Sequence, residues 1–231
     1  MKKNLNLCNK TVTIYYNETY KNKRIPVIIL NTYDENSEEI WNDSKKISNE
    51  YILVSISNID WNSEMSPWYM DRLYKNGEDY LGKADSYLLE LTNTILKEVS
   101  LFINNNIKLE IKEFIIGGYS LAGLFALYSI YKTKIFTKII ACSGSFWYPN
   151  FIEYVKTNRI DNNPKKIYFS LGNKESKTKN SIMSKVEVNT RYLESYYKQI
   201  GIEAIFEENE GNHFQDVNSR IVKGIRWILN E

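Results

Sequence analysis

The sequence has few cysteines and histidines, and this scarcity excludes several kinds of chemistry. Its two cysteines, Cys8 and Cys142, are far apart and have neither the spacing of a metal site nor that of a redox pair. Its only histidine is His213, and one histidine with scattered carboxylates does not easily supply the ligands of a catalytic zinc. We therefore expect no metal ion and no cofactor.

Long apolar runs and an excess of charge are also missing. No segment approaches about 18 consecutive apolar residues, so no membrane span is expected. The basic residues 1–6 are not followed by the apolar stretch of a signal peptide, which favours a cytoplasmic protein. A net charge of +2, with lysines spread along the chain, gives no reason to expect nucleic acid or a membrane surface as a partner.

The pattern of strands and helices predicts an α/β fold. No internal repeat or flexible linker divides the chain, so we expect one domain over residues 1–231. Two β-rich runs, residues 11–16 and 25–30, predict an antiparallel N-terminal hairpin. From residue 51 onward strands and helices alternate, which predicts a mostly parallel central sheet with helices on both faces. Chemistry on such a sheet gathers at the carboxyl ends of its strands.

Residues 113–127 contain the strongest functional pattern. A short apolar run leads through two glycines to Ser120 and into an apolar segment too long for a typical strand, which predicts a strand, a sharp turn and a buried helix. Residues 118–122, Gly-Tyr-Ser-Leu-Ala, have the G-x-S-x-A pattern of a nucleophile elbow, where the residues two before and two after the serine must be small. The alternative is an ordinary turn in which the serine caps the helix.

A base and an acid follow Ser120 at predicted strand ends. His213 lies between the last predicted strand and the last helix, and no other side chain of the sequence is as suited to act as a base near neutral pH. Glu175 follows an earlier strand, although a solvated surface glutamate is a common alternative. The order Ser120, Glu175, His213 is the order of nucleophile, acid and base in α/β-hydrolases. Asp216 and Glu187 are weaker candidates for the acid.

Four motifs resemble one family. Residues 117–128 are similar to the elbow of the putative-esterase (esterase D-like) family of α/β-hydrolases, and within it to siderophore trilactone esterases. Residues 143–147, Ser-Gly-Ser-Phe-Trp, resemble that group's Ser-x-Ser-x-Trp motif. Residues 172–175 and 211–214 match its acid and histidine loops. The resemblance implies an α/β-hydrolase fold and serine esterase chemistry, and it leaves the substrate open.

The resemblance has limits. It extends from about residue 51 to the C-terminus and is weakest in the N-terminal part and in residues 58–84. Ala122 stands where many members of the family have glycine, a change that we expect to be tolerated sterically. The absence of an export signal, which we expect from residues 1–6, is a second departure from the family.

Serine esterase chemistry requires an oxyanion hole as well as a nucleophile, a base and an acid. We expect Ser120 to attack the ester carbonyl while His213 takes its proton and Glu175 orients the imidazole. The backbone N–H of Leu121 would supply one oxyanion donor. The second donor should come from the loop that follows the strand at residues 51–57, near Ser57 to Ile59. Asn58 is our candidate, and the sequence leaves the choice within that range open.

The substrate pocket is predicted from aromatic residues in and beyond an irregular stretch of the chain. Residues 58–84 form the longest irregular stretch, and their aromatic content predicts a packed, pocket-covering loop. Arg72 and Lys75 could meet an anionic group. Equally, the tryptophans could simply pack the loop. The aromatic residues predicted to line the pocket are Trp61, Trp68, Phe146 and Trp147.

These observations favour a serine carboxylesterase that acts on a small-molecule ester, and they make no prediction about the oligomeric state. An acyltransferase or thioesterase with the same three residues is one alternative. A non-catalytic binding domain of the same fold is another, but the presence of all three residue types argues against it.

Overall fold

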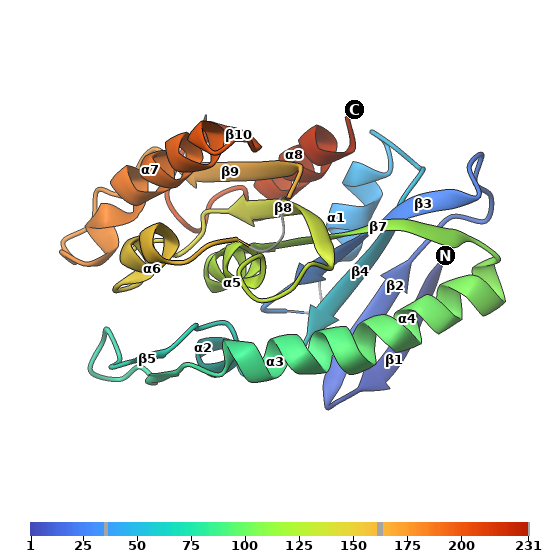
Figure 1. Ribbon diagram of the computed structural model, residues 1–231, viewed down its shortest axis with the longest axis horizontal. Helices are drawn as coiled ribbons and strands as arrows, with labels where there is room; N and C mark the ends of the chain where they lie inside the picture. The colour runs from blue at the N-terminus through green and yellow to red at the C-terminus, as the bar shows by residue number, and fades with distance from the viewer. Residues whose placement is uncertain (35–36, 161–163, 231) are drawn as a thin grey trace. The chain divides into compact units, whose positions relative to one another are not determined.

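The structure is a computed structural model that describes residues 1–34, 37–160 and 164–230. The chain forms two compact units, Met1–Ile116 and Gly117–Glu231. Strand β7 (Glu110–Tyr119) begins in the first unit and ends in the second (Figure 1). The expectation of a single domain therefore stays a prediction, and each unit is described in turn.

In the first unit the strands of the larger sheet follow the order β1-β2-β4-β3, and β5 and β6 form a separate two-stranded sheet. Strands β3 and β4 pair in parallel, whereas β2 pairs with β4 in the antiparallel direction. The elements before β7 are β1 (Lys2–Leu7), β2 (Lys10–Tyr15), β3 (Arg24–Asn31), α1 (Glu38–Ser44), β4 (Ile52–Ser57), α2 (Trp61–Glu64), β5 (Tyr69–Met70), β6 (Tyr80–Leu81), α3 (Ala84–Glu90), η1 (Leu91–Ile95), α4 (Leu96–Phe102) and η2 (Ile103–Ile107).

The N-terminal hairpin is present, but it joins different strands from those predicted. Strand β2 pairs with β1, and the run at residues 25–30 lies in β3, which pairs with β4 in parallel. The turn between β1 and β2 consists of Cys8 and Asn9, both with left-handed φ values of 53° and 59°, as a tight two-residue hairpin turn requires. Strand β1 escaped prediction because its sequence, KKNLNL, is polar and mostly exposed.

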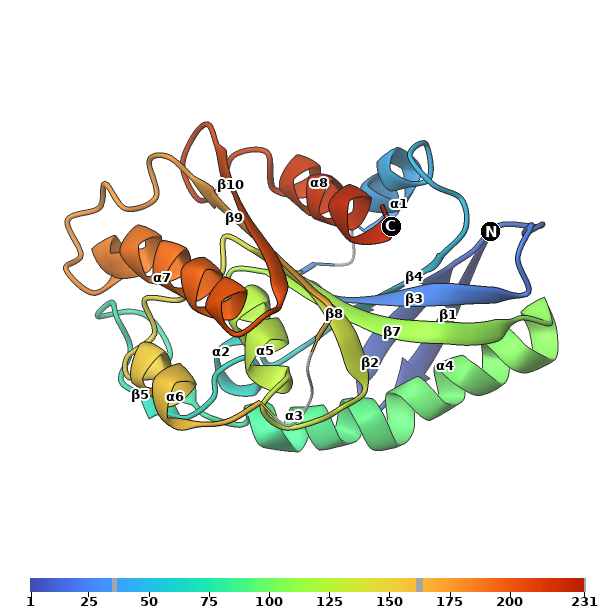
Figure 2. The same cartoon turned by 45° about the horizontal axis from the view of Figure 1, so that its top comes forward.

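The second unit contains parallel strands with helices packed against them. Its strand order is β7-β8-β9-β10, and β9 pairs in parallel with both β8 and β10. Helix α8 lies on the side of these strands away from α5 and α7 (Figure 2). The elements after β7 are α5 (Leu121–Ser129), β8 (Phe136–Cys142), α6 (Phe151–Thr157), β9 (Lys166–Gly172), η3 (Met183–Lys185), α7 (Val186–Gln199), β10 (Glu203–Asn209) and α8 (Val217–Leu229).

These pairings confirm the predicted fold class, a mostly parallel sheet with helices and an N-terminal antiparallel hairpin. The central strands are mostly apolar and are buried: every residue of β4 is buried, and so is every residue of β9 after its first. That pattern is typical of strands covered on both faces. Within the described part of the chain, no helix is long and apolar enough to cross a membrane.

Candidate active site

Ser120 lies on the turn that joins strand β7 to helix α5. Its φ and ψ angles are 60° and −123°, a left-handed conformation that is unusual for a residue other than glycine. Its backbone N–H donates to the Cys142 carbonyl at 3.1 Å, and its own carbonyl accepts from the Ser145 N–H at 3.0 Å. Hydrogen bonds to the end of β8 and to the turn that follows it therefore hold the strained residue in place.

Small residues around Ser120 make this turn sterically possible. A Cβ atom added to Gly118 would collide with the Cβ of Ala122 and lie 2.7 Å from its carbonyl carbon. A Cβ on Gly123 would approach the Gly144 Cα at 3.0 Å. Position 118 must therefore be glycine or nearly as small, because a larger side chain there would collide with Ala122.

The Gly118→Ala variant should be less stable than the wild type by about 1–3 kcal/mol, because the added methyl group overpacks a site that has no room for it. The free energy of unfolding, measured by urea denaturation, tests this. Gly77→Ala is the matched control, since its nearest atom there would be the Tyr74 carbonyl oxygen at 3.3 Å. Equal losses in the two variants would contradict the account of the Ser120 turn.

His213 brings its imidazole to Ser120 from the loop between β10 and α8. Its Nε2 atom lies 3.0 Å from Ser120 Oγ, and its side chain is 27% exposed. The His213 carbonyl accepts a hydrogen bond from the Tyr119 hydroxyl at 2.8 Å, which fixes the loop beside the serine. The ring of Phe214, which is 85% exposed, meets the imidazole edge to face.

Glu175 occupies the other side of the imidazole. Its Oε2 atom lies 2.6 Å from His213 Nδ1, in the place where an acid that orients the ring would stand. Neither rival carboxylate is recorded in contact with His213. Glu187 accepts hydrogen bonds from Ser176 and Arg191, and Asp216 is an exposed residue at the N-terminus of α8.

Three donors hold the second oxygen of Glu175. Oε1 accepts from the Gly172 N–H at 2.7 Å, from the Ser143 hydroxyl at 2.8 Å and from Arg220 at 2.7 Å. Burial opposes ionisation of Glu175. The hydrogen bond and charge of His213, with the donors Gly172 and Ser143, outweigh that effect and hold the pKa of Glu175 below its usual value.

The lowered pKa of Glu175 links the site to acid stability. A group whose pKa is lower in the folded than in the unfolded chain stabilises the fold at pH values above its unfolded pKa, here about 4.5. That contribution is lost as the pH falls through the lowered folded value. Glu175 therefore remains a carboxylate throughout the neutral and mildly acidic range.

Arg220 and Tyr119 are the residues of this site that the sequence interpretation missed. Arg220 has no exposed surface, and its guanidinium reaches Tyr119, Ser143 and Glu175. One sequence signal was available. Arg220 falls beside Ile221 on the apolar face of the last helix, and a charged residue on a buried face is almost always paired.

The predicted oxyanion donors lie in different units. Leu121 is the first residue of α5, so its N–H is one of those that have no acceptor within the helix. Asn58 directly follows β4 in the first unit, has a left-handed φ of 59°, and donates from its side chain to the Asn9 carbonyl at 2.7 Å. Their joint role as an oxyanion hole stays a prediction.

The four aromatic residues predicted to line the pocket have different surroundings. Trp61 and Trp68 are half-buried in the first unit, and Trp61 packs edge to face against Tyr33. Phe146 has no exposed surface, and Trp147 is 8% exposed. Phe146 thus belongs to the core of the second unit, and contact of these four residues with a substrate stays a prediction.

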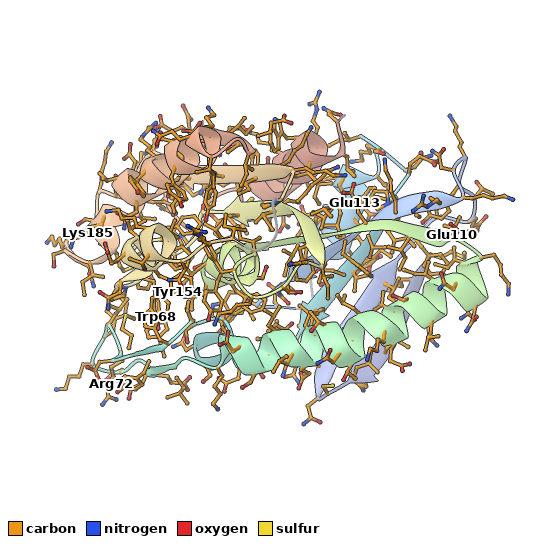
Figure 3. All side chains as sticks on the ribbon, viewed as in Figure 1. Trp68, Arg72, Glu110, Glu113, Tyr154 and Lys185 are labelled. Atoms are coloured by element: carbon orange, nitrogen blue, oxygen red, sulfur yellow. The ribbon has the colours of Figure 1, made fainter. Side chains whose placement is uncertain are left out.

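The loop at residues 58–84 contains more regular structure than predicted. Helix α2 and the short antiparallel pair β5–β6 lie within it. Trp68 and Arg72 flank β5 (Figure 3). The side chain of Arg72 lies 3.8 Å from Asp79, so this predicted cation already has a carboxylate neighbour. Among residues 1–34, 37–160 and 164–230, no group of three or more His, Cys, Asp or Glu is placed to hold a metal ion.

The parallel strands, the helices on both of their faces and the serine on the turn after β7 define an α/β-hydrolase fold. The chain belongs to the family described as "Putative esterase", whose model matches residues 7–224. This membership confirms the family resemblance seen in the sequence and supports esterase activity.

Individual proteins are similar to this chain in sequence or in structure. An uncharacterized protein of Bacillus subtilis, YbbA, is 24% identical over 188 residues, which are 79% of this chain and 74% of that protein. An IroE-like serine hydrolase from Shewanella oneidensis has a similar structure, with a TM-score of 0.77, 15% identity and coverage of 99% of this chain and 79% of that one. The siderophore hydrolase EstB from Aspergillus nidulans gives a TM-score of 0.74, 14% identity and coverage of 97% and 93%. At these identities the two structures show a shared fold.

Proposed function

We propose that this protein is a serine carboxylesterase in which Ser120 is the nucleophile, His213 the general base and Glu175 the acid that orients the base. One observation supports the proposal above all. A continuous chain of hydrogen bonds runs from Glu175 Oε2 to His213 Nδ1 at 2.6 Å and from His213 Nε2 to Ser120 Oγ at 3.0 Å. This is the geometry that proton transfer from a serine to an imidazole needs.

The proposed reaction has two halves. In the first, Ser120 Oγ attacks the ester carbonyl as His213 Nε2 takes its proton, and the same nitrogen then protonates the departing alcohol. The Leu121 N–H and a donor at Asn58 stabilise the oxyanion; each such donor typically lowers the barrier by about 3–4 kcal/mol. In the second half, water attacks the acyl-enzyme with His213 as its base and frees Ser120.

The proposed substrate class is a small-molecule ester of the siderophore type. Two considerations support it: the similar solved structures include a siderophore hydrolase, and aromatic side chains and cations gather in residues 58–84. A catecholate ester would suit aromatic walls with a nearby cation. In this proposal the loop at residues 58–84 covers the pocket and selects the substrate.

A panel of esters tests the proposed function. Purified wild-type protein is assayed with short-acyl esters, long-acyl esters and a catecholate trilactone, and Ser120→Ala is assayed in parallel. We expect hydrolysis of the short-acyl esters and of the trilactone by the wild type alone. If the folded wild type cleaves no member of the panel, the carboxylesterase proposal is wrong. Cleavage of simple esters without the trilactone would overturn only the substrate class.

Turnover should decrease in acid, because an imidazole that is already protonated cannot accept the proton of Ser120. Glu175 does not contribute to this loss, because its pKa lies below its usual value and it stays ionised throughout the neutral and mildly acidic range. The pH dependence of kcat/KM between pH 5 and 8 measures the effect. A flat profile would count against His213 as the base.

A further inference from the structure

Arg220 is fully buried in the second unit and is not one of the three proposed catalytic residues. It lies on α8 with no exposed surface, and its partners come from four separate segments of the chain. The guanidinium donates through Nη1 to Tyr119, Ser143 and Glu175, and through Nη2 to the carbonyls of Glu210 and Asn212. A cation so placed joins the serine turn, the acid and the histidine loop.

The two edges of the guanidinium have different partners. Nη1 lies 2.7 Å from Glu175 Oε1, which leaves Oε2 directed at His213. Nη2 donates at 3.0 Å to the carbonyl of Asn212, the residue immediately before His213. The backbone of His213 is held as well. Nη1 donates to the Tyr119 hydroxyl, and that hydroxyl donates to the His213 carbonyl. Arg220 therefore restrains Glu175 and both sides of His213 at once.

The surrounding sequence leaves space for this arrangement. A Cβ added to Gly172 would lie 2.7 Å from Arg220 Nη2 and would also collide with the Gly211 carbonyl oxygen. The carboxylate of Glu175 is 3% exposed and the arginine side chain 1% exposed, so the two charges neutralise each other away from water. A buried carboxylate without such a partner would strongly destabilise the folded protein.

From this geometry we infer that Arg220 is a positioning residue for the proposed reaction, holding Glu175 and the histidine loop in the arrangement that His213 needs to act on Ser120. This inference rests on the proposed function. Arg220 also has an electrostatic effect, because Glu175 interacts both with this permanent cation and with the imidazole. Without Arg220, the whole charge would act on His213 and favour its protonated form.

A single-histidine titration tests this inference independently of activity. His213 is the only histidine of the sequence, so protein labelled with ¹³C-histidine gives one imidazole signal whose pH dependence can be followed by NMR. Three variants are compared with the wild type: Arg220→Met, Arg220→Lys and Arg226→Met. Arg226 is an exposed arginine on the same helix and serves as the matched control.

We expect the titration midpoint in Arg220→Met to rise by about one pH unit. We also expect kcat to fall by about 10²-fold with KM nearly unchanged, because misplacing catalytic groups slows the reaction without weakening binding. Arg220→Lys keeps the charge but cannot reach both edges, so its midpoint should match the wild type while kcat still falls. Arg226→Met should match the wild type in both measurements.

The inference is overturned if folded Arg220→Met has the midpoint and kcat of the wild type. If Arg220→Met does not fold, Arg220→Lys decides: a lowered kcat supports the positioning role, and a wild-type kcat overturns it. Labelling of the wild type with a fluorophosphonate separates this inference from the proposed function. If the wild type is not labelled, the esterase proposal is wrong. If the wild type is labelled and the Arg220 variants keep its titration midpoint and kcat, only the inference about Arg220 is wrong.

Discussion

The Ser120→Ala variant is expected to lose about 10⁶-fold in kcat for ester hydrolysis while retaining its fold. Alanine removes the Oγ atom that lies 3.0 Å from His213 Nε2, and no other atom of the residue can form the acyl-enzyme. Residual turnover would come from water activated in the same site. Initial rates at saturating ester concentration, with circular dichroism to verify the fold, measure the effect.

Ser129→Ala is the matched control for that loss. Ser129 is a buried serine at the other end of helix α5, and its hydroxyl donates to the Ala126 carbonyl within the helix at 2.7 Å. Its removal should leave kcat within about twofold, since it touches none of the reacting atoms. Retention of hydrolysis by Ser120→Ala would mean that the protein uses another nucleophile.

Glu175→Gln is expected to lower kcat by about 10⁴-fold. The amide has the shape of the carboxylate but no charge, so it cannot stabilise the imidazolium that forms as His213 takes the serine proton. It also offers an NH₂ group where the carboxylate accepts hydrogen bonds, either from His213 or from Gly172 and Ser143. KM should change little, because the carboxylate is 3% exposed and out of reach of the substrate.

Two further variants decide which carboxylate is the acid. Glu187→Gln and Asp216→Asn make the same chemical change at the two rival positions, and both should keep kcat within about threefold of the wild type, because surface substitutions have small effects. A loss in either variant that exceeds the loss in Glu175→Gln would transfer the acid role to that residue.

Local patterns explain how much of this site could be predicted. Ser120 was identifiable because the backbone strain of its turn restricts residues 118 and 122 to small side chains. That restriction can be recognised within five consecutive residues of the sequence. The contact of His213 with Glu175 was predictable because each follows a strand, and parallel strands bring their carboxyl ends to one edge. The rule about strand ends can be applied once the strands have been located in the sequence.

Other features depend on contacts between distant residues and had no comparable local pattern. Strand β1 is polar because it pairs at the edge of the sheet, so hydrophobicity could not identify it. The role of Arg220 is defined by partners from Tyr119 to Asn212, which only the folded chain brings together. The ring of Phe146 packs against Phe151 and Phe169, and its aromatic character alone does not distinguish a core position from a place in the predicted pocket.

The most direct test of the account is covalent labelling of the wild-type protein with a fluorophosphonate, followed by peptide mapping by mass spectrometry. The reagent phosphonylates a serine only where a neighbouring base activates the hydroxyl and an oxyanion site receives the phosphoryl oxygen. The account predicts one modified residue, Ser120, and no modification in His213→Gln. No label on the folded protein, or a label on another serine, would contradict the central claim that Ser120 is the nucleophile.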